Sequence, residues 1–125
     1  MFNRLALIGC GLMGGSLALA MQRACLVRHV VAYSPSEGTL QAALQAGVIH
    51  EAAHSPADAA AHADLVVVAV PVAATETVLR SIASSLSAQT IVMDVGSTKQ
   101  NVIEAAEATL GSHIGQFVPA HPIAG

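Results

Sequence analysis

The sequence has little aromatic and little basic character. Its 125 residues include no tryptophan, one tyrosine and two phenylalanines, and five lysines and arginines stand against eight aspartates and glutamates, for a formal net charge of −3. The basic residues form no cluster, so the chain offers few stacking platforms for bases and little attraction for phosphate backbones or anionic lipids. Nucleic acid and membrane surfaces are therefore poor candidates for its partners.

Long apolar runs and cysteine pairs are also missing. No run reaches the length of a membrane-spanning helix without a glycine or a charge inside it. The two cysteines, Cys10 and Cys25, are far from a Cys-x-x-Cys spacing, which is typical of reduced intracellular thiols. We therefore expect a cytoplasmic protein.

The abundant residues are aliphatic and predict one α/β domain over residues 1–125. Alanine, valine, isoleucine and leucine dominate a hydrophobic fraction of 54%, as expected of a parallel sheet covered on both faces. The continuous run Leu65–Val70 fits a strand buried on both sides. Strands alternate with helices along the chain, which predicts right-handed crossovers and a doubly wound, mostly parallel sheet of the Rossmann type.

The pattern also places the individual elements. We expect strands at Leu5–Ile8, His29–Tyr33, Leu65–Val70, Thr90–Asp94 and Gln116–Val118, with at best a short edge strand at Val48–Ile49. Helices are expected from Leu17 to about Arg23–Cys25, at Glu37–Ala46, after Ser55-Pro56, at Ala73–Ser84 and at Gln100–Leu110. Either Ser36 or Ser34 can cap the second helix, and Gly47 is a typical residue just past its end.

The chain is organised around its first strand and the turn that follows. The apolar Leu5–Ile8 leads into Gly9-Cys10-Gly11-Leu12-Met13-Gly14, which is the dinucleotide fingerprint in the setting it requires, between a strand and a helix. Gly9 permits the tight turn, Gly11 leaves room for a pyrophosphate, and Gly14 lets the helix pack closely on the strand. The N–H groups at the helix start then face the anion.

Other distinctive residues follow the ends of other strands. In an open parallel sheet, ligands bind beyond the carboxyl ends of the strands, so these residues are expected to share one crevice. The predicted cofactor-binding residues are Gly9, Cys10, Gly11, Leu12, Met13, Gly14, Ser34, Ser36, Val70, Pro71 and Gly96.

Ser97 and His121 are the candidates for chemistry in this crevice, and each has a structural alternative. Ser97-x-x-Gln100 is also a capping-box pattern. His121 lies between Pro119 and Pro122 on a predicted loop, where a buried structural imidazole is less common. His50, His54 and His62 lack the alignment and the further ligand that a metal site needs, so no metal is predicted.

With the loops that contain Ser97 and His121 included, the whole chain resembles the cofactor-binding domain of the prephenate dehydrogenases. This family includes arogenate and cyclohexadienyl enzymes of tyrosine biosynthesis. The resemblance rests on Gly9–Ser16, Ala69-Val70-Pro71-Val72, Asp94–Lys99 and above all His121–Gly125. The first motif is shared by many dehydrogenases, whereas the last two in this order and spacing are specific.

The resemblance implies oxidative decarboxylation of prephenate or arogenate to 4-hydroxyphenylpyruvate or tyrosine. It gives His121 the role of the base that takes the C4 hydroxyl proton, and Ser97 that of positioning this hydroxyl. It also implies a helical substrate and dimerisation domain after residue 125, a homodimeric whole protein and a fragment that alone is inactive. A hydroxyacid or imine dehydrogenase and a non-catalytic nucleotide sensor are the alternatives.

The choice of cofactor is expected to depend on Ser34. It lies twenty residues beyond Gly14, where NAD-specific folds carry an aspartate or glutamate for the ribose hydroxyl. A serine does not repel a 2′-phosphate and can donate to it, although Pro35 follows in place of a cation. We therefore expect both NAD and NADP to be accepted, with a preference for NADP.

Overall fold

A computed structural model of the protein describes residues 2–9, 11–95, 109–110, 115 and 117–119. These residues build a six-stranded sheet in the order β3-β2-β1-β4-β5-β6, and every neighbouring pair is parallel. The strands are β1 (Phe2–Ile8), β2 (Val27–Tyr33), β3 (Glu51–Ala52), β4 (Leu65–Val68), β5 (Ile91–Asp94) and β6 (Phe117–Pro119). The predicted α/β class and the doubly wound parallel sheet are confirmed.

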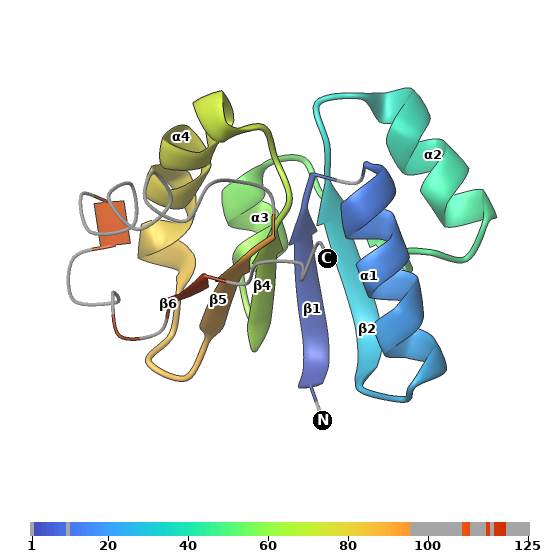
Figure 1. Cartoon of the computed structure of the whole chain (residues 1–125), viewed down its shortest axis with the longest axis horizontal. Coiled ribbons are helices and arrows are strands. Elements are labelled where there is room, and N and C mark those ends of the chain that lie inside the picture. Colours follow the sequence, from blue (N-terminus) through green and yellow to red (C-terminus); the bar gives the residue numbers. More distant parts are fainter. Residues whose placement is uncertain (1, 10, 96–108, 111–114, 116, 120–125) are drawn as a thin grey trace, which may run out of the picture.

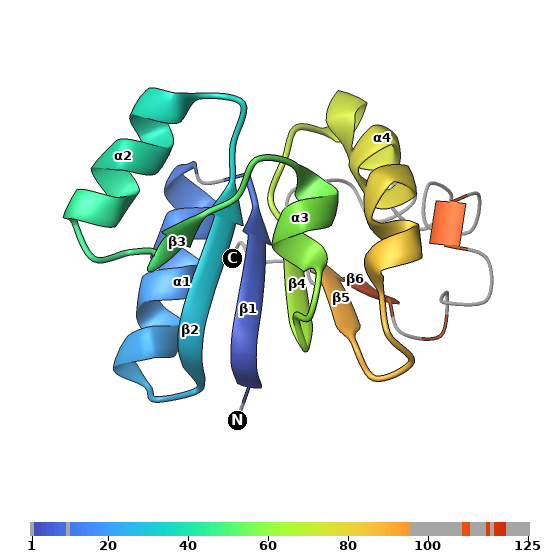
Figure 2. The same ribbon diagram turned by 180° about the vertical axis from the view of Figure 1, so that it is seen from behind.

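The helices cover the sheet from both sides (Figures 1 and 2). They are α1 (Leu12–Arg23), α2 (Glu37–Gln45), α3 (Pro56–Ala60) and α4 (Val72–Ile82), the last continuing into a short 3-10 turn at Ala83–Ser85. The α1 and α2 helices lie on one face, and α3 and α4 on the other. Of the helix expected at Gln100–Leu110, only Thr109 and Leu110 are described, and both are helical.

Two apolar clusters hold the layers together because the sheet is buried on both faces. Leu5, Leu7 and Val67 point toward α1 and α2, where Ala18 and Leu40 meet them. The alternate residues of the same strands, including Ala6, Ile8 and Val66, pack toward α3 and α4. All four residues of β4 are buried, as the apolar run predicts. The strand ends at Val68, two residues before the expected end at Val70, and Ala69 and Val70 are half-buried in the turn that follows. No helix in the described part of the chain is both long and apolar enough to span a membrane.

The helix ends follow the expected chemistry. The hydroxyl of Ser36, not that of Ser34, accepts the Thr39 N–H at 3.3 Å and so caps α2. Ser55 caps α3 in the same way through the Asp58 N–H at 3.0 Å. Gly47 has φ +75°, the left-handed conformation that lets the chain leave α2.

The edge strand expected at Val48–Ile49 is wrong. The N–H groups of both residues donate to the Ala43 carbonyl, at 3.0 and 3.4 Å, so they close the end of α2 instead of joining the sheet. Ile49 is buried in the core beside that helix. The β3 strand therefore forms three residues later, at Glu51–Ala52, and pairs with Val31 and Ala32.

Candidate functional site

The candidate site is the edge where the carboxyl ends of β1, β2, β4 and β5 meet. The order β3-β2-β1-β4-β5 places β2 and β4 on either side of β1. The chain leaves the carboxyl end of β1 toward β2 and that of β4 toward β5, in opposite directions, so this edge is the switch point where such sheets bind ligands. The structure brings together Gly9, Gly11, Gly14, Ser34 and the Val70-Pro71 pair at this edge. Ser36 begins α2 beside it, and the backbone of Leu12 and Met13 forms the first turn of α1. Cys10, Gly96, Ser97 and His121 lie outside the described residues.

Gly9 is held in a turn that no other residue fits. Its φ is +92°, and an added Cβ would collide with the Ala69 carbonyl oxygen and come within 2.9 Å of Val70 Cγ1. The Gly9 N–H donates to the Tyr33 carbonyl, and the Ala69 N–H donates to the Ile8 carbonyl, both at 2.8 Å. These two hydrogen bonds join the turn at Ile8 and Gly9 to the ends of β2 and β4.

Gly14 sets how closely α1 approaches the sheet. A Cβ at this position would lie 2.6 Å from the Gly9 carbonyl oxygen and 3.1 Å from both Leu7 Cδ1 and Ala69 Cβ. A backbone carbonyl cannot move aside as a flexible side chain can. The helix start therefore stays against the turn only while residue 14 is glycine.

We expect Gly14→Ala to destabilise the fold by about 1–3 kcal/mol, the usual cost of overpacking. Gly15→Ala is a matched control in the same helix, because its Cβ would meet only Val48 Cγ1 at 3.7 Å, an ordinary contact. That control is expected to stabilise by up to about 1 kcal/mol through helix propensity. Urea unfolding measures both changes, and equal effects of the two substitutions would contradict the close approach at Gly14.

Gly11 makes the start of α1 open to a ligand. It occupies the N-cap position, yet no side chain caps the helix and the first turn carries no acidic residue. The α4 helix after Pro71 also lacks a side-chain cap, whereas serines cap α2 and α3. A Cβ on Gly11 would have no described atom within 4 Å, so the described part of the chain leaves the space in front of this turn open. The unpaired N–H groups of a helix start suit a phosphate or pyrophosphate, and this cradle fits the pyrophosphate of a dinucleotide.

The hydroxyls at the end of β2 accept local hydrogen bonds, which use both lone pairs of Ser36 Oγ and one lone pair of Ser34 Oγ. Ser34 Oγ accepts the Ser36 N–H at 3.2 Å, and Ser36 Oγ accepts both the Thr39 N–H and the Thr39 hydroxyl, at 3.3 and 3.0 Å. Because a hydroxyl has two lone pairs and one proton, Ser36 retains only its donor. The strand end therefore offers hydroxyl donors and no carboxylate at position 34.

Two features of the site were not foreseen from the sequence. Asp94 at the end of β5 is a buried carboxylate, 3% exposed, beside the same edge. The sequence feature that could have indicated it is a charged residue at the end of an apolar strand. A groove of about 440 Å³ also runs between α1 and α2 from Gly11 past Ser16 and Thr39 to Ala46. The residues that line the groove come mainly from two helices. The groove could therefore not be predicted without knowing how α1 and α2 pack together.

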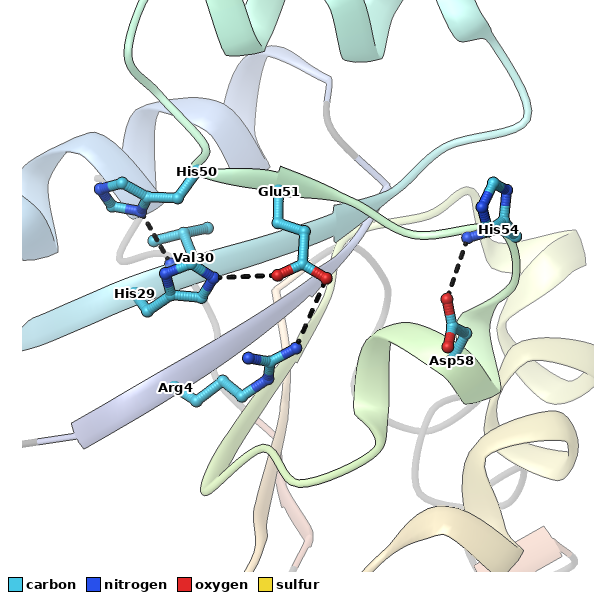
Figure 3. A network of polar contacts seen from close by, with 7 residues as sticks. All are labelled: Arg4, His29, Val30, His50, Glu51, His54 and Asp58. Atoms are coloured by element: carbon cyan, nitrogen blue, oxygen red, sulfur yellow. Dashed lines mark hydrogen bonds and ion pairs between the residues drawn. The ribbon is translucent and has the colours of Figure 1, made fainter.

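His29 and His50 belong to a separate polar network at β2 and β3 (Figure 3). His50 Nδ1 accepts the Val30 N–H at 2.9 Å and its ring stacks on His29, with centroids 5.2 Å apart. Glu51 joins His29 at 3.2 Å and Arg4 at 3.7 Å. His54 lies apart from this network, and within the described ranges no three histidine, cysteine or acidic side chains form a group that could hold a metal.

The strand order, the glycine turn and the open helix start together define a doubly wound domain of the Rossmann type. The chain belongs to the family described as "Prephenate dehydrogenase, nucleotide-binding domain", which it matches over residues 17–125.

Its relatives include longer dehydrogenases. It is 37% identical over 126 residues to prephenate dehydrogenase of Bacillus subtilis, covering 100% of this chain and 34% of that protein. It is 36% identical to cyclohexadienyl dehydrogenase of Zymomonas mobilis, over 99% of this chain and 42% of that protein. The crystal structure of A. aeolicus prephenate dehydrogenase with hydroxyphenyl propionate and NAD+ superposes with a TM-score of 0.88 at 28% identity, over 100% of this chain and 43% of that one. The chain thus spans less than half the length of each.

Proposed function

We propose that this chain is the cofactor-binding part of an NAD(P)-dependent oxidoreductase that oxidatively decarboxylates prephenate, arogenate or both. The observation that carries the proposal is the open start of α1 at the switch point, with free space in front of Gly11. The backbone of Gly11, Leu12 and Met13 would hold the pyrophosphate, which the turn at Gly9 and the close packing at Gly14 position. Ser34 and Ser36 would contact the adenosine ribose. Val70, Pro71, Cys10 and Gly96 would complete the cofactor contacts.

The chemistry would depend on two residues that follow β5 and β6. The nicotinamide, when bound, supplies the acceptor for the hydride that leaves the substrate ring. His121 would accept the proton of the substrate's C4 hydroxyl, because an imidazole is poised to take up a proton near neutral pH. Ser97 would hold that hydroxyl in place. Support for both roles comes from the motifs Asp94–Lys99 and His121–Gly125 together with membership of the family.

The remainder of the site would come from a helical domain after residue 125, which would hold the substrate carboxylate and form a homodimer. This part of the proposal is supported by the length of the relatives, of which the chain covers 34% and 42%. The cytoplasm is the proposed location, in keeping with an exposed, free Cys25. Prephenate and arogenate are then distinguished mainly by groups outside the present chain.

The test of the proposal is an assay of the natural full-length protein with prephenate and with arogenate, each in the presence of NAD or NADP. Formation of reduced nicotinamide together with carbon dioxide from at least one substrate is the expected result. A full-length protein that binds the cofactor but oxidises neither compound would contradict the proposed reaction and favour a sensor or another dehydrogenase.

Ser34→Asp is expected to shift cofactor preference strongly toward NAD. The unmodified site has donors and no carboxylate at this position, so we propose that it accepts both cofactors and prefers NADP. An aspartate would repel the 2′-phosphate of NADP and accept a hydrogen bond from the ribose hydroxyl of NAD.

The ratio of kcat/KM for NADP to that for NAD, before and after the substitution, measures the shift. Ser34→Ala is the matched control, because it removes the hydroxyl at the same position without adding charge, and a smaller change is expected. An unmodified protein that prefers NAD by more than about 100-fold, about 2.7 kcal/mol, would show that Ser34 does not select the cofactor.

A further inference from the structure

Asp94 is the one charged side chain that is buried within the described part of the chain. It is 3% exposed, and the other buried polar side chains there are the hydroxyls of Thr75 and Thr90. A carboxylate loses its hydration at such a position, so a fold retains it only where a positive charge or hydrogen-bond donors meet it. We therefore expect Asp94 to face a group of complementary chemistry.

The strand register places Asp94 where both residues proposed for the chemistry leave the sheet. Asp94 ends β5 and lies in register with Val68 of β4 on one side and Pro119 of β6 on the other (Figure 1). Ser97 follows Asp94 by three residues, and His121 follows Pro119 by two. The segments that contain these two residues therefore begin beside the carboxylate.

The face on which Asp94 lies is the one that β6 also presents to the core. Side chains alternate along a strand. Val92 belongs to the apolar cluster under α3 and α4, whereas Met93 packs on the opposite cluster, so Asp94 shares the face of Val92. Phe117 of β6 packs on the same cluster as Val92. An extended continuation of β6 would keep position 121, four residues after Phe117, on this face.

The arginines of the chain lie away from the carboxyl end of β5. Two are in the first halves of strands and two are in the last turns of helices, namely Arg4 in β1, Arg28 in β2, Arg23 in α1 and Arg80 in α4. Each of these helices joins two parallel strands and so ends near their amino ends. The nearest basic side chains in the sequence are Lys99, five residues after Asp94, and His121.

From this placement we infer that Asp94 is a positioning residue whose carboxylate accepts a hydrogen bond from the imidazole of His121. The inference rests on the proposed function and deepens it. One ring nitrogen of the base must be open to take up the proton of the substrate hydroxyl. A carboxylate on the other nitrogen fixes that tautomer, orients the ring and stabilises the imidazolium that forms. Asp94 itself stays ionised and does not contact the substrate.

The pH dependence of kcat/KM in the natural full-length protein separates this role from a purely structural one. The base acts only when it is deprotonated, so activity rises with pH as the imidazole loses its proton. Asp94→Asn keeps the size of the side chain but removes the charge that favours the imidazolium. We expect the midpoint of the rise to move down by about one pH unit or more, and kcat to fall at least about tenfold.

Asp64→Asn is the matched control, because it removes a carboxylate beside the opposite end of the neighbouring β4 strand, where Asp64 accepts the N–H groups of Asn3 and Arg4 at 2.8 Å. It should leave the midpoint in place. Calorimetric titration with NAD checks that each variant still folds and binds the cofactor. A lowered kcat in Asp94→Asn with an unmoved midpoint would overturn the inference, since Asp94 would then only support the segment before Ser97 or pair with Lys99.

Nuclear magnetic resonance of the same full-length protein reads the pairing without turnover. The ring signals of His121 are assigned by their loss in His121→Asn. In the unmodified protein at acid pH we expect a strongly downfield ring N–H signal, as for an imidazolium bonded to a carboxylate, and its absence would overturn the inference even if Asp94→Asn failed to fold. If this signal were present but neither prephenate nor arogenate were oxidised, the proposed function would fail while the pairing stood.

Discussion

In the full-length protein, His121→Asn is expected to lower kcat by at least about 100-fold while cofactor affinity stays nearly unchanged, because a general base acts only as the transition state forms. Asparagine keeps a polar side chain of similar reach but cannot take up a proton at neutral pH. Steady-state kinetics with saturating substrate, together with a calorimetric titration of the cofactor, separates the two effects.

Ser97→Ala is the companion variant and should cost less, since positioning a hydroxyl is a smaller contribution than removing its proton. If His121→Asn kept near-normal kcat, the base would have to be another residue. The roles carried over from the family motif would then fail at this position, although the cofactor site on the described strands would be unaffected.

Gly11→Val is expected to abolish cofactor binding and leave the domain folded. A Cβ on Gly11 would meet no atom of the described residues within 4 Å, and Gly11 has φ −84°, a value that valine adopts. The same free space is the one proposed for the pyrophosphate, so a branched side chain would fill it. Calorimetric titration with NAD and NADP, beside urea unfolding of the same samples, measures both properties.

Gly11→Ala completes this series as a smaller obstruction and should weaken binding less than valine does. Gly15→Ala, one turn further into the helix, should leave the affinity unchanged. Retention of cofactor affinity within about threefold in Gly11→Val, about 0.7 kcal/mol, would remove Gly11 from the site.

The strongest local patterns of the sequence predicted the framework of the fold. The apolar run from Leu65 forms a buried strand as far as Val68, and Gly9 and Gly14 of the fingerprint occupy positions where a side chain would clash. Ser55-Pro56 starts a brief helix with the proline in its first turn, as expected. These features depend on neighbours in the sequence, which is why the sequence alone indicated them.

Features that depend on competing hydrogen bonds or on the packing of two elements were harder to predict. Val48 and Ile49 look like a strand, but the carbonyl of Ala43 takes their N–H groups, and this competition between helix end and sheet is not visible in a residue pattern. The α1–α2 groove required the two helices to be packed. Likewise, the choice of Ser36 over Ser34 as the cap depended on the turn after β2.

The placement of the cofactor at the carboxyl edge is tested most directly by following the backbone amide signals of the isotope-labelled chain during a titration with NAD. The largest shifts are predicted for residues 9–14, for Tyr33, Ser34 and residues 36–39, and for Ala69, Val70 and Val72, at the ends of β1, β2 and β4. The opposite edge has its own cavity of about 410 Å³, lined by His62, Asp64 and Thr90 among others, whose signals should stay in place. Shifts concentrated around His62 and Thr90, with none near Gly11, would contradict the account.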